Sequence, residues 1–204
     1  MIKTLIKKIL YTLLSRFIVQ QGTTDSIYIT FDDGPHPDNT LRILETLEIH
    51  NVHATFFMTG LEMMKHQGIV KKVSAAGHVI AYHGYAHTSM KKQNIRDFTS
   101  DILKAKELEQ IFGIKLALYR PPYGDISLSG FLYLMTHGWK IIMWSLDSRD
   151  SFDTLEQVKN NVSARSIKPG EIILFHDDYD KTASLLDSIL SDYKTAKLNI
   201  STSF

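Results

Sequence analysis

From Ser26 onward, short apolar runs alternate with longer segments whose apolar residues recur at helical spacing. The predicted strands are Ile27–Phe31, Thr55–Met58, His78–Tyr82, Leu116–Tyr119, Lys140–Trp144 and Ile172–Phe175, with a weaker one near Leu198–Ile200. The predicted helices are Thr40–His50, Glu62–Ala76, Arg96–Phe112, Leu128–His137, Thr154–Ser166 and Thr182–Tyr193. Strands that alternate with helices in this way are expected to be parallel and joined by helical crossovers. Both a barrel and an open sheet fit this pattern.

The length and composition allow one substantial core. The chain has 204 residues, of which 44% are apolar, and residues 26–204 contain no linker, low-complexity run or solenoid repeat. We therefore expect one domain over residues 26–204. The chain has no cysteine, which excludes disulfides and thiolate metal sites, so any bound metal must use His, Asp or Glu.

Polar residues recur at the points where the predicted strands end. They are Asp32 and Asp33 after the first strand, His83 and His87 after the third, Arg120 after the fourth, Asp147 and Asp150 after the fifth, and His176 with Asp177 after the sixth. In α/β barrels the catalytic groups gather at the carboxyl ends of the strands. The recurrence therefore favours a barrel and predicts one shared site.

The segment Thr30–Pro37 reads TFDDGPHP and places two carboxylates at the end of a strand. Neighbouring side chains on a regular strand point to opposite faces, so both can serve one site only if the backbone leaves strand geometry, which Gly34 permits. Taken alone, Asp-Asp-Gly is more typical of a solvated turn. The motifs downstream change this interpretation.

His83 and His87 are four residues apart, a spacing that allows both imidazoles to bind one cation. Alone the pair is a weak motif, because the chain has nine histidines. With Asp33 it gives two nitrogen ligands and one carboxylate, which is the composition of a catalytic zinc site with room for water. Nitrogen ligands also argue against magnesium.

Arg120 and His176 have both a structural and a functional interpretation. Two prolines follow Arg120 and fix its direction, so its guanidinium could hold a carboxylate in the ionised form; the alternative is a weak ion pair on a surface turn. A histidine after a buried strand, such as His176, is often a satisfied core residue. Beside an acid and a metal it becomes a candidate proton donor, because a nearby carboxylate raises its pKa.

Five ordered motifs together resemble those of the polysaccharide deacetylases of the NodB-homology type, carbohydrate esterase family 4. They are Thr30-Phe31-Asp32-Asp33-Gly34, His83-x-x-x-His87, Arg120-Pro121-Pro122-Tyr123-Gly124, the Asp147–Asp150 segment and Leu174-Phe175-His176. The resemblance covers residues 26–200. It implies a distorted (β/α) barrel that hydrolyses acetyl groups from a glycan containing N-acetylhexosamine.

The resemblance also implies which residues bind a metal. Asp33, His83 and His87 would bind a divalent ion, expected to be Zn²⁺. Two departures from the family pattern lie near this site: Gly84 stands where Ser or Thr often follows the first metal histidine, and Ser151 stands where tryptophan often follows the fourth motif's aspartate. The first puts the rigidity of the loop in doubt, and the second removes an apolar wall of the substrate groove.

The catalytic residues implied by the resemblance complete the predicted site. Asp32 would be the general base, oriented by Arg120, and His176 would be the general acid. The backbone amide of Tyr123 would help to hold the oxyanion. Asp150, from the fourth motif, belongs to the same predicted catalytic set.

Three other functions remain to be weighed against an N-deacetylase. An O-acetyl esterase would use the same metal and base, and the sequence does not separate the two activities. A carbohydrate-binding pseudoenzyme predicts the loss of a metal ligand, the base or the acid, and none of these is lost. A metal-dependent phosphatase would need a phosphate cradle of glycine-rich amides or clustered basic residues, which we do not find.

Residues 2–18 predict an amphipathic basic helix, and we treat residues 1–21 as an element separate from the domain. Its apolar stripe could lie on a membrane surface or cover one end of the barrel. A poorly recognised signal anchor is a third alternative, which Arg16 disfavours because it interrupts the apolar stretch. Arg16 interrupts any signal-peptide core, so no cleavable signal is predicted, and a cytoplasmic or membrane-associated location is expected. Residues 26–204 are not basic, which argues against a nucleic-acid partner.

Overall fold

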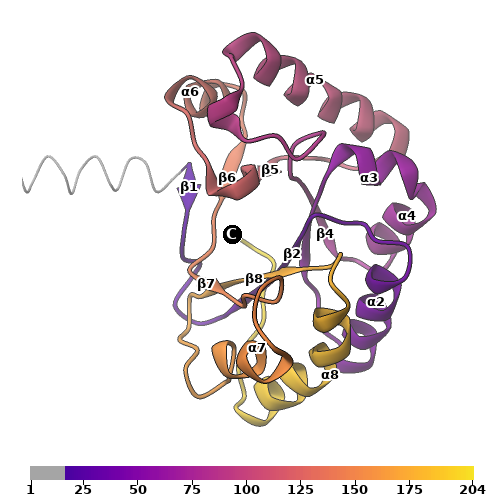
Figure 1. The fold of residues 1–204 in the computed structure, drawn as a ribbon, viewed down its shortest axis with the longest axis vertical. Coiled ribbons are helices and arrows are strands. Elements are labelled where there is room, and N and C mark those ends of the chain that lie inside the picture. The colour runs from indigo at the N-terminus through magenta and orange to yellow at the C-terminus, as the bar shows by residue number, and fades with distance from the viewer. Residues whose placement is uncertain (1–16) are drawn as a thin grey trace, which may run out of the picture.

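Eight parallel strands form one curled sheet in the computed structural model, which describes residues 17–204 (Figure 1). The strands are β1 (Ile18–Val19), β2 (Tyr28–Asp32), β3 (Thr55–Met58), β4 (Val79–Tyr82), β5 (Leu118–Tyr119), β6 (Lys140–Ile142), β7 (Leu146–Asp147) and β8 (Ile172–His176). Their order across the sheet is β1-β6-β5-β4-β3-β2-β8-β7. The predicted parallel arrangement is confirmed, and its form is a distorted barrel.

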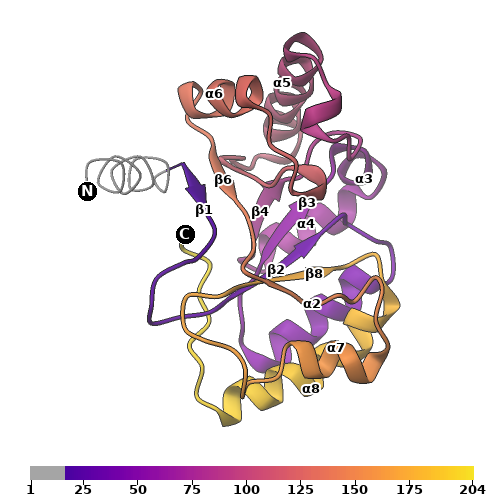
Figure 2. The same ribbon diagram turned by 60° about the vertical axis from the view of Figure 1, so that its left-hand side comes forward.

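Helices connect the strands on the outside of this sheet (Figure 2). They are α2 (Asn39–His50), α3 (Gly60–Lys65), α4 (Gln67–Ala75), α5 (Ile95–Phe112), α6 (Leu128–Thr136), α7 (Leu155–Asn161) and α8 (Asp180–Thr195), with short 3₁₀ turns η1 (Met90–Lys92) and η2 (Pro122–Gly124). Local sequence sets several helix starts. For example, the Asn94 side chain accepts from the Asp97 amide at the start of α5, and Thr154 forms a capping box with Gln157 at the start of α7.

Side-chain alternation along β2 divides the buried residues between two cores. Ile29 and Phe31 point outward into the larger core between the sheet and the helices, whereas Tyr28 belongs to a smaller core inside the barrel. Thr30 and Asp32 alternate in step with Tyr28, so they also face the interior. A carboxylate thereby enters the barrel at the end of a fully buried strand.

The chain itself links the two edges of the sheet. The amide of Met143, just after β6, donates to Val19 O of β1 (2.8 Å), while the amide of Ser145, just before β7, donates to Ile172 O of β8 (3.0 Å). The residues between β6 and β7 therefore cross from the β1 edge of the sheet to the opposite edge, where β7 lies beside β8. This crossing brings Trp144 to the carboxyl ends of the strands.

Three strands differ clearly from the sequence-based expectation. The predicted strand Lys140–Trp144 ends at Ile142 because the chain crosses the barrel there, and β7 then forms without having been predicted. At the other edge, Ile18 pairs with Ile141 in β1 instead of ending a helix. The rest of the predicted helix over residues 2–18 lies outside the described residues. Among residues 17–204, no helix is both long and apolar enough to span a bilayer.

Some element ends also differ. The predicted helix Glu62–Ala76 is two helices, α3 and α4, because the backbone at His66 leaves helical geometry with φ −120° and ψ 47°. The predicted helix Thr154–Ser166 stops at Asn161, whose side chain donates to Ser148 O (3.1 Å). The weak strand near Leu198–Ile200 is reduced to a single bridge between Ile27 and Ile200.

Phe31 should be a major contributor to stability, because its ring stacks on Phe56 and Phe175 with centroid distances of 4.9 and 5.8 Å. Phe31→Ala is expected to lower the free energy of unfolding by about 3–5 kcal/mol, since it leaves a cavity in the core. Urea unfolding measures this change. The matched control is Phe152→Ala, which removes a ring that is 80% exposed and should cost less than about 0.5 kcal/mol. Equal losses in the two variants would contradict this assignment of the core.

Candidate active site

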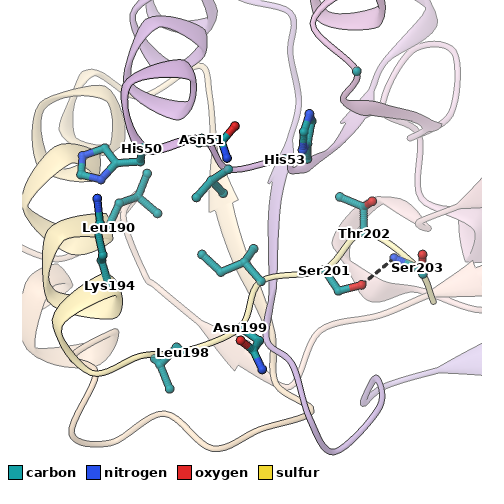
Figure 3. Close-up of a pocket in the computed structure, with 13 residues that line it drawn as sticks. His50, Asn51, His53, Leu190, Lys194, Leu198, Asn199, Ser201, Thr202 and Ser203 are labelled. Carbon is teal, nitrogen blue, oxygen red and sulfur yellow. Dashed lines mark hydrogen bonds between the residues drawn. The ribbon is translucent and has the colours of Figure 1, made fainter.

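A cleft of about 310 Å³ opens at the carboxyl ends of the strands. The predicted site residues that line it are Asp32, Asp33, His83, His87, Tyr123 and His176. A larger cavity of about 600 Å³ lies at the opposite end of the barrel, where the end of α2, the side of α8 and residues 198–203 meet (Figure 3). None of the predicted catalytic or metal-binding residues lines that larger cavity.

Arg120 is completely buried, and every nitrogen of its guanidinium donates a hydrogen bond. Nη1 donates to Asp32 Oδ1 (2.7 Å) and to Thr30 Oγ1 (2.8 Å). Nε donates to Ile142 O and Nη2 to Met143 O, both at 3.1 Å. The group also lies 3.9 Å from the centre of the Phe57 ring. These contacts leave Arg120 one orientation and fix one oxygen of Asp32.

The other oxygen of Asp32 faces the histidines. Asp32 Oδ2 lies 3.7 Å from His83 Nε2, and the Asp32 side chain is only 4% exposed. Burial raises the pKa of Asp32, while the charge of Arg120 opposes that rise. A carboxylate with one oxygen fixed and a raised pKa can accept a proton at the second oxygen.

Asp33 turns away from the barrel interior because its φ is +77°, outside strand geometry. Its Oδ1 is buried and has no hydrogen-bond partner, although His87 Nε2 lies 3.1 Å away and His83 Nε2 lies 3.4 Å away. One ligand atom from each of these three residues lies within 4.8 Å of the others. The arrangement is therefore a candidate metal-binding group, and its unpartnered oxygen is explained if a cation binds there.

The tautomer of His83 also suits a cation. His83 Nδ1 lies 2.7 Å from Arg120 O, and because a carbonyl oxygen can only accept, Nδ1 must carry the hydrogen. Nε2 is then left with its lone pair directed toward Asp33. Burial lowers the pKa of His83 to about 3, so the ring stays neutral. The donor set fits a divalent ion that accepts nitrogen and oxygen ligands.

The loop between the two histidines is held by neighbouring elements. The first two amides of α3, from Gly60 and Leu61, donate to Gly84 O (3.0 Å) and Tyr85 O (2.9 Å). Asp101 accepts from the Tyr85 amide, with Oδ2 at 3.0 Å. Gly84 itself has φ +76°, where a side chain would be strained. The loop thus has fixed contacts without the hydroxyl that Gly84 replaces.

His176 forms a close pair with Asp150. His176 Nδ1 lies 2.7 Å from Asp150 Oδ1, and the His176 amide donates to Asp150 Oδ2 at the same distance. Thr182 donates to Oδ2 as well. Burial lowers the pKa of His176, but the hydrogen bond and charge of Asp150 outweigh it and raise the pKa to about 9. For the acid Asp150 burial acts in the opposite direction and would raise the pKa. The contacts of Asp150 with His176 nevertheless keep the pKa of Asp150 below its ordinary value.

Aromatic side chains line the rim of the cleft. Tyr123 is 67% exposed, has φ +60°, and lies with its ring 4.6 Å from that of His87. Within residues 17–204 the Tyr123 amide donates to no other protein group. Ser151 and Phe152 both line the cleft. The apolar surface missing at Ser151 is therefore available one residue later, from Phe152. Asp147 lies at the same rim, where it accepts from the Arg149 amide (2.8 Å).

Sequence reasoning missed two residues that support the site. Thr30 accepts from Arg120 and donates to Ile173 O (2.7 Å). It lies two positions before Asp32 on the same strand. Because alternate side chains of a strand face the same side, the sequence could have indicated that Thr30 lies beside Asp32. Asp101 contacts the histidine loop from the middle of α5, and only the tertiary fold reveals this contact.

Comparisons with known proteins agree with this geometry. Residues 20–141 match the family model described as polysaccharide deacetylase. A peptidoglycan-N-acetylglucosamine deacetylase of Bacillus cereus is 36% identical over 178 residues, which is 83% of this chain and 63% of that relative. The chain therefore spans less than two thirds of that relative's length. A chitooligosaccharide deacetylase of Sinorhizobium fredii is 32% identical, over 79% of this chain and 77% of the relative.

A solved structure is also similar. The crystal structure of the Bc1960 peptidoglycan N-acetylglucosamine deacetylase, in complex with an N-hydroxybenzamide compound, superimposes with a TM-score of 0.87. The two chains are 30% identical, and the alignment covers 94% of this chain and 93% of the other. The likeness therefore extends over nearly the whole of both chains.

The pKa of His176 provides a direct test of the pair with Asp150. In metal-free protein we expect a pKa near 9 by NMR titration of the imidazole, and Asp150→Asn should lower it clearly, because only the smaller contributions of the Asp32 and Asp33 charges then oppose burial. In the wild type, the His176–Asp150 pair should stabilise the folded protein fully at pH values below the pKa that His176 has in the unfolded chain. This contribution to the free energy of unfolding should be lost as the pH rises through 9, the pKa in the folded protein. Asp147→Asn is the matched control and should leave the pKa unchanged. An unshifted pKa in Asp150→Asn would contradict the pairing.

Proposed function

The chain belongs to the polysaccharide deacetylase family, and from that premise we propose that it is a metal-dependent hydrolase that removes acetyl groups from N-acetylated sugars of a poly- or oligosaccharide. The observation that carries the proposal is that the two carboxylate oxygens of Asp32 have different neighbours. Its Oδ1 is fixed by Arg120, and its Oδ2 lies beside His83 at the candidate metal group. A base and a metal site therefore adjoin in one cleft.

In this proposal Asp33, His83 and His87 hold the metal, and zinc is the ion that best suits their two nitrogens and one carboxylate. The unpartnered Asp33 Oδ1 and the lone pair on His83 Nε2 support the assignment. When bound, such an ion polarises the acetyl carbonyl and lowers the pKa of an attacking water.

Asp32 acts as the general base. It takes a proton from water at Oδ2, because Oδ1 is already shared with Arg120. The buried environment raises the pKa of Asp32 and so its affinity for that proton, while the charge of the neighbouring guanidinium favours the ionised form that accepts it. Arg120 thus orients the base without contacting the substrate.

His176 acts as the general acid. Its Nδ1 is engaged with Asp150, so Nε2 carries the transferable proton to the leaving nitrogen of the sugar. The raised pKa keeps the ring charged at neutral pH. The Tyr123 amide, which has no other protein acceptor among the described residues, is suited to hold the developing oxyanion.

The substrate is proposed to be a glycan that contains N-acetylhexosamine. The names of the two relatives, a peptidoglycan-N-acetylglucosamine deacetylase and a chitooligosaccharide deacetylase, support this class. Another cavity, of about 440 Å³, adjoins the cleft and shares Asp33 and His87 with it, so a sugar chain could continue past the candidate metal group. An O-acetyl esterase remains the second candidate, because the same base would serve an ester with a better leaving group.

Acetate release from N-acetylglucosamine oligomers, peptidoglycan and acetylxylan, with and without chelator, tests the proposed activity. Asp32→Asn should keep the bound metal but lower kcat by about 10²-fold or more, because an amide cannot accept the proton from water. Asp33→Asn should instead lose metal, as measured by elemental analysis. The reverse pattern in the two variants would mean that Asp33 is the base and Asp32 the metal ligand. Full activity in protein verified to be metal-free would refute metal dependence.

The cavity next to the cleft leads to a separate prediction. Leu61 lines it and is 48% exposed, so Leu61→Ala should reduce the advantage in kcat/KM of a tetramer over a dimer of N-acetylglucosamine while the rate on the dimer is kept. Leu103→Ala on α5, where the side chain is 55% exposed, is the matched control and should have no effect. An unchanged ratio in Leu61→Ala would remove this cavity from the substrate path.

A further inference from the structure

Asp33 needs support from its surroundings to face the histidines. Its φ of +77° is uncommon for a residue with a side chain, and such a conformation persists only where neighbouring contacts determine it. The next residues, Gly34, Pro35 and His36, form the loop that leads to α2. The groups that hold this loop therefore decide where the Asp33 carboxylate points.

Asp177 is at the centre of the contacts that hold the loop. Its amide donates to Asp32 O (3.3 Å), which ties the end of β8 to the end of β2. Its Oδ2 accepts from the hydroxyl of Thr40 (2.6 Å), and that hydroxyl in turn accepts from the His36 amide (2.7 Å). One short chain of hydrogen bonds thus runs from the loop, through α2, to Asp177.

Gly34 packs directly against the same carboxyl group. A Cβ placed on Gly34 would lie 2.1 Å from Asp177 Oδ2 and 2.2 Å from Oδ1, so a side chain at Gly34 cannot coexist with Asp177 in this position. On the other side of the loop, the Thr59 amide donates to Gly34 O (3.1 Å). The loop is therefore held between the end of β3 and Asp177.

Packing alone does not explain an acidic residue here. Asp177 is 1% exposed, and its Oδ1 has no hydrogen-bond partner. A buried polar atom without a partner is costly, and an apolar side chain would fill the space at lower cost. Asp177 lines neither the catalytic cleft nor the cavity next to it, so contact with substrate does not explain it either.

We propose that Asp177, acting through Thr40, is a positioning residue that sets the Asp33 carboxylate toward His83 and His87. The inference rests on the metal site of the proposed function. Asp177 contacts neither a metal ligand side chain nor the reacting atoms; it fixes the backbone on both sides of Asp33. Partners that orient metal ligands typically change metal affinity by about 10- to 100-fold when they are removed.

The test measures Zn²⁺ affinity by competition with a chromogenic chelator. Thr40→Val keeps the shape of the side chain but removes the hydroxyl, and Asp177→Ala removes the carboxyl group; each should weaken Zn²⁺ binding by about 10- to 100-fold. Asp177→Asn retains an oxygen that can accept from Thr40, so it should restore most of the affinity. Thr40→Val also leaves His176 untouched, which separates this effect from any disturbance of the acid.

Thr46→Val is the matched control, because Thr46 lies on the same helix and its hydroxyl donates only to Arg42 O. Thermal unfolding of the metal-free variants confirms that each is folded. Wild-type affinity in Thr40→Val and Asp177→Ala would overturn the inference and leave the metal site intact. An equal loss in Thr46→Val would also overturn it, since the effect would then be general. If the wild-type protein bound no Zn²⁺, the metal site and this inference would fail together.

Discussion

The buried pair of Arg120 and Asp32 is the interaction on which the site depends. Arg120 begins where β5 ends, yet it donates to Asp32 and Thr30 on β2 and to two carbonyls at the end of β6. Burying such a charge is costly unless all of its donors are satisfied. Because the partners of Arg120 come together only when β2, β5 and β6 are in register, the same contacts that orient Asp32, the proposed base, also fix the end of the barrel.

Two adjacent carboxylates acquire different environments from a single change in backbone direction. Asp32 keeps strand geometry and enters the barrel beside Arg120, whereas Asp33 adopts φ +77° and faces His83 and His87. Sequence reasoning predicted that the backbone must leave strand geometry here, because side chains on a regular strand alternate. It attributed the departure to Gly34. The structure shows that Asp33 itself carries the unusual φ, while Gly34 is needed because Asp177 lies against it.

The parts of the fold that follow from side-chain periodicity were predictable, and the parts that follow from tertiary contacts were not. Strand β3 has the predicted bounds because all four of its residues are buried and the three after Thr55 form a continuous apolar run. Strand β7 was missed because its two residues pair only after the chain has crossed the barrel. The candidate metal ligands and His176, the proposed acid, line one cleft as the motifs predicted, but the support from Asp101 comes from a helix whose sequence pattern carries no sign of it. Ser151 led to the expectation that the substrate groove lacks an apolar wall. The adjacent Phe152 nevertheless lines the same cleft, because a loop can direct either of two neighbouring side chains toward it.

The charges of the site favour a cation at the candidate metal group. Three carboxylates, from Asp32, Asp33 and Asp150, lie near two cationic groups, those of Arg120 and His176. Burial and the neighbouring acids raise the pKa of Asp177 to about 8, so that side chain adds little negative charge at neutral pH. Asp150 is compensated by His176 and Asp32 by Arg120, which leaves the carboxylate of Asp33 without a partner of opposite charge. A divalent ion held by Asp33, His83 and His87 would reverse this imbalance and make the cleft electropositive, as the stabilisation of an oxyanion requires.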